Sequence, residues 1–467
     1  MSTGFSSLNT ALNGLSAAQR ALDTTSQNIV NANTPGYSRQ RVLLESVGNT
    51  PEASFHTGSA AVVGGVRVTD VSRIRDAFLE GTRAAAGAKQ ASIGSQLDIL
   101  NGAQQLLAEP GDTGMQATVD SFYASWHDLA NNPTDTAAGS VVIQRGIAVA
   151  DQLHYVVDGI AAQWTTAHDN LVDVVAQTNQ AAADLAKLNE SIQEGTSAGQ
   201  PVNELMDTRD TLVRKLATLV GGSSSMDQQG RVSVGVNGIN LVSGNIHQTM
   251  VLTGGNDVST VSADPPGLRI GAFAVPVDSG QAAGMLAAMR TDLPALTDKV
   301  NTVAASVIGI VNGVYSTGYA QDGSTGNAFF GGTDAHSIAV VPTQGAQLSI
   351  AAAAGTVDGS IAAHLGDLAD DATSATALGR PGPSAQWRQM TGTLGVQAQS
   401  LTTGKSVQDA VVSAAEDAVQ SNAGVNLDEE MTNMMLFQRA YQASARVITT
   451  IDETMDTLIN RTGKVGL

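Results

Sequence analysis

Apolar residues near the N-terminus recur at alternating intervals of three and four. This spacing places them on one face of a helix, as the a and d positions of a coiled coil do. The stripe consists of Phe5, Leu8, Leu12, Leu15, Gln19, Leu22, Ser26 and Ile29, of which only Gln19 and Ser26 are polar. Chain ends usually fray, so a helix with this stripe needs a partner to cover it.

The C-terminal region carries a matching stripe. Its members are Met434, Phe437, Tyr441, Ser444, Ile448, Ile451, Met455 and Leu458. Asn426, with Glu429 three residues later, predicts the start of this helix. Either stripe alone is typical of an ordinary surface helix, but two at opposite ends favour a shared role. Each stripe must be buried against the rest of the chain, the other stripe or neighbouring subunits.

A third stripe predicts one very long helix. Apolar residues hold the same spacing from Ala150 to Ile192, and the helix should run from about Asp135 to Glu194. At a rise of 1.5 Å per residue it would be about 85 Å long. Shorter helical patterns precede it, at 93–107 and 115–129, and another follows at 205–219. A helix of this length indicates an elongated rod.

From Gly221 the pattern becomes strand-like. Val232, Val234 and Val236 alternate with small residues, and the following Asn237-Gly238 pair predicts a hairpin. Helical spacing returns at 286–314, where Pro294 should begin or kink the helix. Short apolar runs at 338–341 and 348–352 could complete the β region, and the final third is largely helical. The expected fold is mainly α with a β-rich insert, in an elongated multi-domain rod.

This pattern divides the chain into three expected units. Residues 1–35 and 425–467 should pair as a coiled-coil-like terminal domain. Residues 36–220 and 357–424 should form an extended segment and a long-helix bundle, on which the helix at 280–317 packs. Residues 221–279 and 318–356 should form a β-rich outer domain at the far tip of the rod.

Composition narrows the classes of function. The 467 residues include 43 acidic and 24 basic side chains, for a net charge of −19, which argues against a protein that binds nucleic acid. The absence of cysteine excludes disulfides, zinc ribbons and a thiol nucleophile. No run of about 18 apolar residues predicts a membrane span. No cleavable signal is evident, which leaves a cytoplasmic protein or one exported by an uncleaved route.

The sequence offers no convincing catalytic, cofactor or metal site. The histidines, at 56, 127, 154, 168, 247, 336 and 364, are never three to five residues apart, as a helical ligand pair requires. The stretch TTGKS at 402–406 lacks the first glycine of a phosphate-binding loop. Asp428, Glu429 and Glu430 are explained by the dipole at the start of a helix. We therefore predict no enzyme, no cofactor and no metal.

Two terminal motifs resemble a known family. The stretches LNGLSAAQRALDTTSQNIVNANTPGYSRQRV and GVNLDEEMTNMMLFQRAYQASARVITTIDETMDTLIN are similar to the two ends of bacterial flagellar rod, hook and hook-associated proteins. The family turn motif is Asn33, Thr34, Pro35, Gly36, Tyr37, Ser38 and Arg39. The long helices at 85–220 and the stretch at 280–330 resemble the hook-associated members more than the hook or rod subunits.

The resemblance implies a structural protein that assembles between hook and filament. The two terminal stripes, without their polar members, would be its assembly interface and line the inside of a hollow tube, while the turn leads the chain outward to the next layer. Implied partners are further copies of the chain, the hook subunit, a second hook-associated junction protein, and an export chaperone on the C-terminal helix. No nucleic acid or membrane is expected. Implied localisation is the flagellum, reached by export without a cleaved signal.

Two alternatives remain open from the sequence. The chain could be another flagellar axial protein, such as a hook or rod subunit. It could also be a helical surface adhesin or binding module whose β-rich insert recognises a ligand.

Overall fold

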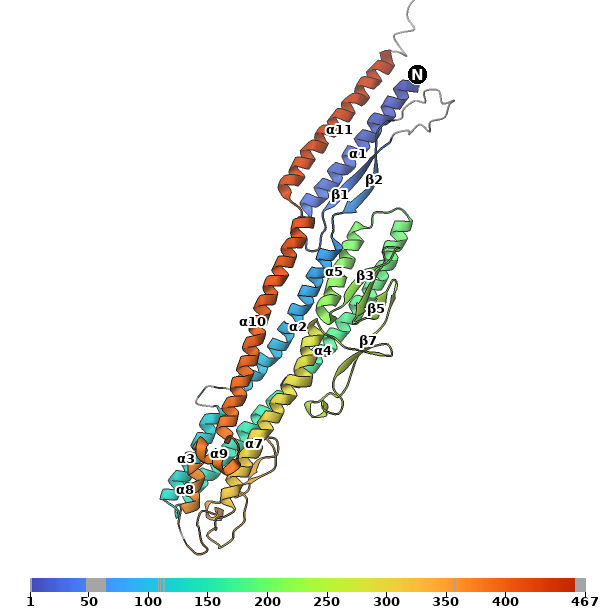
Figure 1. Ribbon diagram of the computed structural model, residues 1–467. Helices are drawn as coiled ribbons and strands as arrows, with labels where there is room; N and C mark the ends of the chain where they lie inside the picture. Colours follow the sequence, from blue (N-terminus) through green and yellow to red (C-terminus); the bar gives the residue numbers. More distant parts are fainter. Residues whose placement is uncertain are drawn as a thin grey trace, which may run out of the picture.

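The computed structural model describes residues 2–47, 64–107, 109, 111, 114–356 and 358–457. It is an elongated rod with both terminal helices at one end (Figure 1). Helix α1 (Ser2–Val30) packs along α11 (Leu427–Asp456), and a two-stranded antiparallel sheet of β1 (Gln40–Ser46) and β2 (Val66–Arg73) packs on α1. The pairing of the two ends that the sequence predicts is present. The sheet was not expected, because residues beyond 36 were grouped with the rod.

Helix α4 (Thr136–Ser197) forms the axis of the rod. Its N-cap is Asp135, whose carboxylate accepts a hydrogen bond from the Ala137 amide at 2.8 Å. Its 62 residues correspond to about 93 Å at 1.5 Å per residue. Leu153, Ile160 and Trp164 on its apolar stripe are completely buried. The predicted long helix is therefore confirmed, to within three residues at its end.

Four further helices complete the rod. They are α2 (Ala77–Leu107), α5 (Asn203–Val220), α7 (Leu293–Tyr315) and α10 (Pro383–Ala423). The first three pack on α4, and the last, α10, packs on α2 and α7. Helix α6 (Gln281–Ala287) continues into α7 through one π-helical turn, η2 (Ala288–Asp292), and Pro294 lies in the first turn of α7. The indole of Trp164 donates to the carbonyl of Met289 in that turn, at 3.0 Å. Pro294 thus follows a π-helical turn within a continuous helical run, and this irregularity fits a proline, which lacks the amide that a regular helix interior needs.

Small sheets lie along the side of the rod. One sheet has the order β3 (Ser223–Met226), β4 (Val232–Val236), β5 (Ile239–Ser243) and β6 (Ile246–His247). The other has the order β7 (Met250–Thr253), β8 (Gly267–Ile270) and β9 (Phe273–Val275). Asn237 and Gly238 have positive φ and join β4 to β5, which confirms the predicted hairpin. Asn189 of α4 ties the first sheet to the rod by donating to the carbonyls of Val232 and Gly244, at 2.8 and 2.7 Å.

The far end of the rod differs from expectation. It contains α3 (Met115–Asn131), α8 (Ser360–Asp367), α9 (Asp371–Leu378) and the short strands β10 (Phe330–Gly331) and β11 (Ala339–Val340). Residues 318–356 therefore lie at the tip, whereas β3 to β9 lie along the side of α4 and α5. The proposed single outer domain of 221–279 and 318–356 must be corrected. The 35 residues from α6 to α7 carry the chain about 50 Å between the two regions.

Candidate assembly interface and its attachment to the rod

The contact face of α1 is built from small residues. Its buried side chains are Ala11, Ala17, Ala18, Ala21, Thr24, Thr25 and Asn28. The larger stripe residues Leu8, Leu15, Leu22 and Ile29 are only half-buried, and Leu12 is 51% exposed. The side chains of Phe5 and Leu458, also predicted for the interface, lie outside the described residues. The stripe of α1 therefore lies beside its buried face and is incompletely covered.

Helix α11 is covered mainly by α1. Met434, Phe437, Ile448, Ile451 and Met455 of its stripe are half-buried, and Tyr441 is 37% exposed. The helices approach closely at Gly14, where an added Cβ would lie 3.2 Å from Oγ of Ser444. The small polar residue in the stripe of α11 thus permits this close approach.

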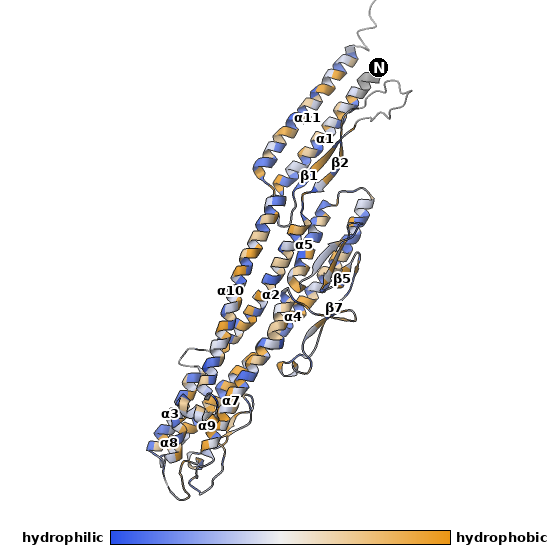
Figure 2. Cartoon of the chain, in the orientation of Figure 1, coloured by the Kyte–Doolittle hydropathy of each residue, from blue (hydrophilic) through white to orange (hydrophobic). Residues whose placement is uncertain are grey.

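Large apolar side chains outside the predicted stripes are exposed on the same helix pair. They are Val30 of α1, and Leu427, Met431, Met435, Leu436 and Val447 of α11. Figure 2 shows apolar residues recurring along both helices. The residues on α11 lie outside its half-buried stripe, so that helix has an apolar surface wider than the single partner α1 can cover. Most of them are not at a or d positions, so the spacing of three and four does not reveal them.

The turn after α1 holds the ends of the two terminal helices together. Tyr37 donates from its hydroxyl to Oδ1 of Asn28 at 2.8 Å, and Asn28 donates from Nδ2 to Oε2 of Glu430 at 3.1 Å. Asn28 and Glu430 are 1% and 2% exposed. Burial, and then the nearby carboxylates of Asp207, Glu430 and Glu204, raises the pKa of Tyr37 to about 12. The Tyr37 hydroxyl is therefore a neutral donor.

Arg39 joins the same turn to the start of α11. Its guanidinium lies 2.7 Å from Oε1 of Glu430 and 3.0 Å from Oε2 of Glu429. The Arg39 amide also donates to the carbonyl of Ala423 at the end of α10, at 3.3 Å. Asn426 caps α11, as predicted, by accepting from the amides of Asp428 and Glu429. The helix dipole alone does not explain Glu430, because its carboxylate is buried and paired.

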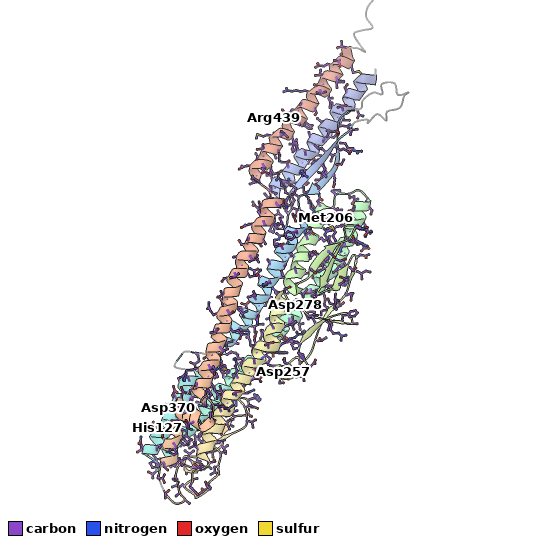
Figure 3. All side chains as sticks on the ribbon, viewed as in Figure 1. His127, Met206, Asp257, Asp278, Asp370 and Arg439 are labelled. Carbon is purple, nitrogen blue, oxygen red and sulfur yellow. The ribbon has the colours of Figure 1, made fainter. Side chains whose placement is uncertain are left out.

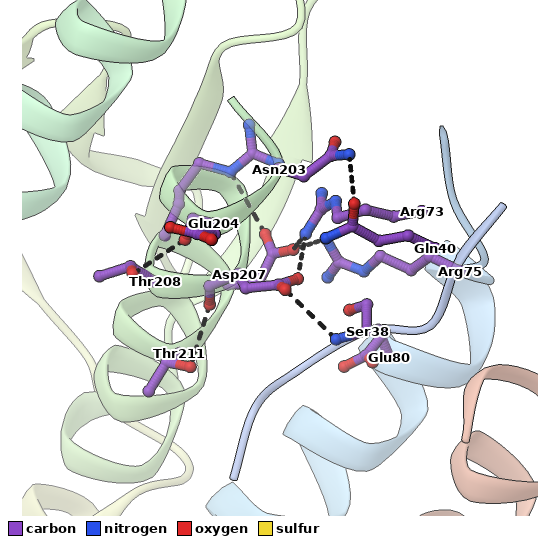
Figure 4. A network of polar contacts seen from close by, with 12 residues as sticks. Ser38, Gln40, Arg73, Arg75, Glu80, Asn203, Glu204, Asp207, Thr208 and Thr211 are labelled. Atoms are coloured by element: carbon purple, nitrogen blue, oxygen red, sulfur yellow. Dashed lines mark hydrogen bonds and ion pairs between the residues drawn. The ribbon is translucent and has the colours of Figure 1, made fainter. Parts of the chain in front are cut away.

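A second cluster attaches the turn and β2 to the rod. The Ser38 amide donates to Oδ2 of Asp207 at 3.2 Å, and Arg73 lies 2.7 Å from Asp207 and 2.9 Å from Asp210, both on α5 (Figure 4). Arg75 also pairs with Asp210. Burial alone would raise the pKa of the Asp210 carboxyl, but Arg75, Arg209 and Arg73 hold it below its ordinary value. Asp210 therefore remains an anion that attaches β2 to α5.

The remaining motif residues shape the turn. Asn33, Thr34 and Pro35 are exposed, and the Tyr37 amide donates to the carbonyl of Thr34 at 3.1 Å. Gly36 has φ of +87°, and an added Cβ would lie 2.8 Å from Oγ1 of Thr211. Glycine is required there by conformation and by space.

Other candidate sites gain no support from the described part of the chain. Among those residues, no three His, Cys, Asp or Glu side chains gather to hold a metal ion, and no helix is both long and apolar enough to cross a membrane. His127 lies at the far end of the rod (Figure 3), 3.9 Å from Asp367. Residues 402–406 lie inside α10, so the TTGKS stretch is helical.

Comparisons with known proteins give separate matches for the rod and for the two terminal helices. The family model described as the flagellar hook-associated protein FlgK helical domain matches residues 100–330. Models of the flagellar basal body rod FlgEFG protein C-terminal region and of the flagella basal body rod protein match residues 418–461 and 8–37. The chain is 29% identical to flagellar hook-associated protein 1 of Bacillus subtilis over the full length of both, and 25% identical to that of Escherichia coli over 97% of this chain and 99% of the relative.

One solved structure is also similar to the chain. The flagellar hook junction protein FlgK from Burkholderia pseudomallei matches with a TM-score of 0.47 and 23% identity, over 54% of this chain and 46% of that one.

The terminal matches on α1 and α11, with the helical-domain match on the rod, define a structural protein of the flagellar axis. The chain is similar over its whole length to flagellar hook-associated protein 1, and its rod helices match the helical domain of that protein. Full-length similarity to that protein, including the rod helices, does not favour a hook or rod subunit or an adhesin.

Proposed function

We propose that this protein is a non-enzymatic structural component of the bacterial flagellum, where its copies assemble as the junction between hook and filament. The exposed apolar surface of α1 and α11 carries the proposal. Leu12, Leu436 and Val447 are 51%, 61% and 48% exposed although they belong to a well-formed helix pair. An apolar surface of this kind marks a contact with another protein.

Different faces of the two helices have separate roles in this assembly. The buried face of α1 and the half-buried stripe of α11 hold the pair together within one chain, while the incompletely covered stripe of α1 and the other exposed apolar residues contact neighbouring subunits. Burial stabilises such contacts by on the order of 25 cal/mol per Å² before the cost of association is subtracted. The Arg39–Glu430 pair holds the turn to α11, and the Arg73–Asp207 pair attaches β2 to α5 of the rod, so that assembly of the helices also places the rods.

The expected partners follow from this arrangement. Further copies of the chain would contact the α1–α11 pair sideways, and the hook subunit and a second hook-associated junction protein would contact it at its two ends. The exposed Met431, Met435 and Leu436 are an aggregation risk before assembly. A cytoplasmic export chaperone would cover them, and the chain would leave the cell without a cleaved signal.

A pair of matched substitutions tests the interface. Leu436→Asp on α11 and Ile246→Asp on β6 alter side chains that are 61% and 66% exposed. Leu436→Asp should abolish incorporation into flagella and motility, because a charge would be buried at a subunit contact. Ile246→Asp should leave both unchanged. Circular dichroism of both purified variants should match the wild type.

Normal motility of the Leu436→Asp strain would contradict the proposed interface, as would normal motility of the Leu12→Asp, Leu15→Asp double variant. The location is tested separately by electron microscopy of cells that lack the protein. These cells should carry hooks without filaments. Normal filaments on the hooks would contradict a junction role.

A further inference from the structure

Five arginines gather where the turn, β2, α2 and α5 meet. They are Arg73, Arg75, Arg83, Arg209 and Arg214, and none of their side chains is more than 25% exposed. The whole chain has only 24 basic residues and a net charge of −19. So many guanidiniums that are buried or partly buried need negative partners, because an unpaired charge shielded from water is costly.

The ion pairs among the described residues give these arginines three carboxylates. Asp210 pairs with Arg73, Arg75 and Arg209, and Asp207 pairs with Arg73. Glu80 serves both remaining arginines through one oxygen: its Oε2 lies 2.6 Å from Arg83 and 3.7 Å from Arg214. Burial, and then the charge of Arg83, lowers the pKa of Arg214. The cluster therefore holds two more positive than negative charges.

A cavity of about 250 Å³ opens beside the arginines with the fewest partners. Arg75, Arg83 and Arg214 line it with the carboxylates of Glu80 and Asp210, residues 32–38 of the turn and the end of α10. The Nε atom of Arg83 is buried and has no hydrogen-bond partner. A buried donor is normally satisfied, so this unpaired Nε, which is shielded from the cavity itself, indicates that the surroundings of Arg83 are short of acceptors.

The helix ends around the cavity offset part of the excess charge. The C-terminal ends of α1 and α10 lie at its wall, through Ala32 and residues 419–425. Each helix C-terminus has a partial charge of about −0.5. Two such ends leave about one positive charge uncompensated, which corresponds to one bound anion.

We propose that this cavity binds a single oxyanion group, a carboxylate or a phosphate, between Arg83 and Arg214. Guanidinium groups bind such planar or tetrahedral oxyanions through paired hydrogen bonds. The group would be either free inorganic phosphate or an acidic side chain of a second copy of the chain, which has 43 Asp and Glu residues. This binding site is separate from the apolar interface that carries the proposed function. A bound anion would also link the turn to α2 and α5.

Calorimetry on the full-length, unassembled protein tests the site. Inorganic phosphate and glutarate are titrated separately in chloride buffer at constant ionic strength. Saturable binding of one equivalent is expected. Arg83→Gln should weaken it at least tenfold, and Glu80→Gln should tighten it severalfold by removing the competing carboxylate. Arg269→Gln, at an exposed arginine on β8, should change nothing.

The two probes separate the sources of the oxyanion. Tight binding of phosphate identifies a free anion as the ligand, whereas binding of glutarate alone identifies an acidic side chain. If Arg83→Gln fails to fold, Arg83→Lys keeps the charge but removes the paired N–H donors of the guanidinium and should still weaken binding. Absence of saturable binding by both probes, or a Glu80→Gln variant that binds no better than wild type, would overturn the proposal. Because no assembly is involved, the result is independent of the junction role.

Discussion

Helices α4 and α11 have the same hydrophobic spacing but very different surroundings. In α4, 21 of 62 residues are buried, and they are mainly apolar. In α11, only one of 30 residues is buried, and that residue is the charged Glu430. The rod supplies α4 with packing partners on several sides, whereas α11 has chiefly α1. Periodicity therefore predicts which face of a helix needs cover, and the fold decides whether the same chain provides it.

This difference predicts two kinds of mutational effect. Replacing a buried side chain of α4 by alanine should destabilise the isolated protein, because the neighbouring side chains cannot fill the cavity that is left. Replacing an exposed apolar side chain of α11 by alanine should leave the stability of the isolated protein nearly unchanged and should weaken only its assembly. The rod is then the independently stable part, and the terminal helix pair is the part completed by neighbours.

The largest effect is expected for Trp164→Ala. The Trp164 side chain is fully buried in α4 and donates to Met289, so its removal should lower the free energy of unfolding by about 4 kcal/mol. Leu436→Ala on α11 should change it by less than about 0.5 kcal/mol. Denaturant unfolding followed by circular dichroism measures both. Equal losses would show that α11 is as well packed as α4.

A smaller effect is expected where the two regions join. Glu430→Ala leaves Arg39 and Asn28 without their buried partner and should cost about 2 kcal/mol locally. Amide exchange in α1 and α11 should become about 30-fold faster, while exchange in α4 stays unchanged. Glu453→Ala, at an exposed position of α11, is the control. Equally faster exchange in α4 would mean that the helix pair and the rod unfold as one unit.

The sequence was sufficient for features set by local physics. The stripe of α4, its start near Asp135 and the Asn237-Gly238 hairpin each depend on neighbouring residues, so periodicity and turn chemistry predicted them. The pairing of α1 with α11 could also be predicted, because two unsatisfied stripes at opposite ends need partners.

The attachment between the regions could not be predicted in the same way. Arg39 and Glu430 are separated by 391 positions, and Arg73 and Asp207 by 134. Nothing near Glu430 distinguishes a buried ion-pair partner from a first-turn carboxylate. The placement of 318–356 depended on the direction of α7, which the spacing of its apolar residues does not give. The available clue is Tyr37-Ser38-Arg39, a group of hydrogen-bond donors at the end of the turn that follows α1.

A third prediction concerns the glycine in the turn. Gly36→Ala places a side chain at φ of +87° and close to Thr211, which should cost about 1.5 kcal/mol. Gly379→Ala is matched in conformation, with φ of +64°, but has open space around it. Amide exchange should quicken in α1 and α11 for the first variant only. The same change in both variants would show that the turn does not control the helix pair.

The smallest effect is expected for Tyr37→Phe, which removes one hydrogen bond to Asn28 and should cost about 1 kcal/mol at neutral pH. The pKa of Tyr37 is about 12 in the folded protein, above the ordinary value of 10, so folding favours the neutral phenol. Its contribution to stability is therefore complete below pH 10 and is lost as the pH rises toward 12. The difference between tyrosinate absorbance titrations of wild type and Tyr37→Phe isolates this group. A difference curve centred near pH 10 would show that the Tyr37 hydroxyl is solvated. The turn between the helix pair and the rod would then be less well packed than the rod.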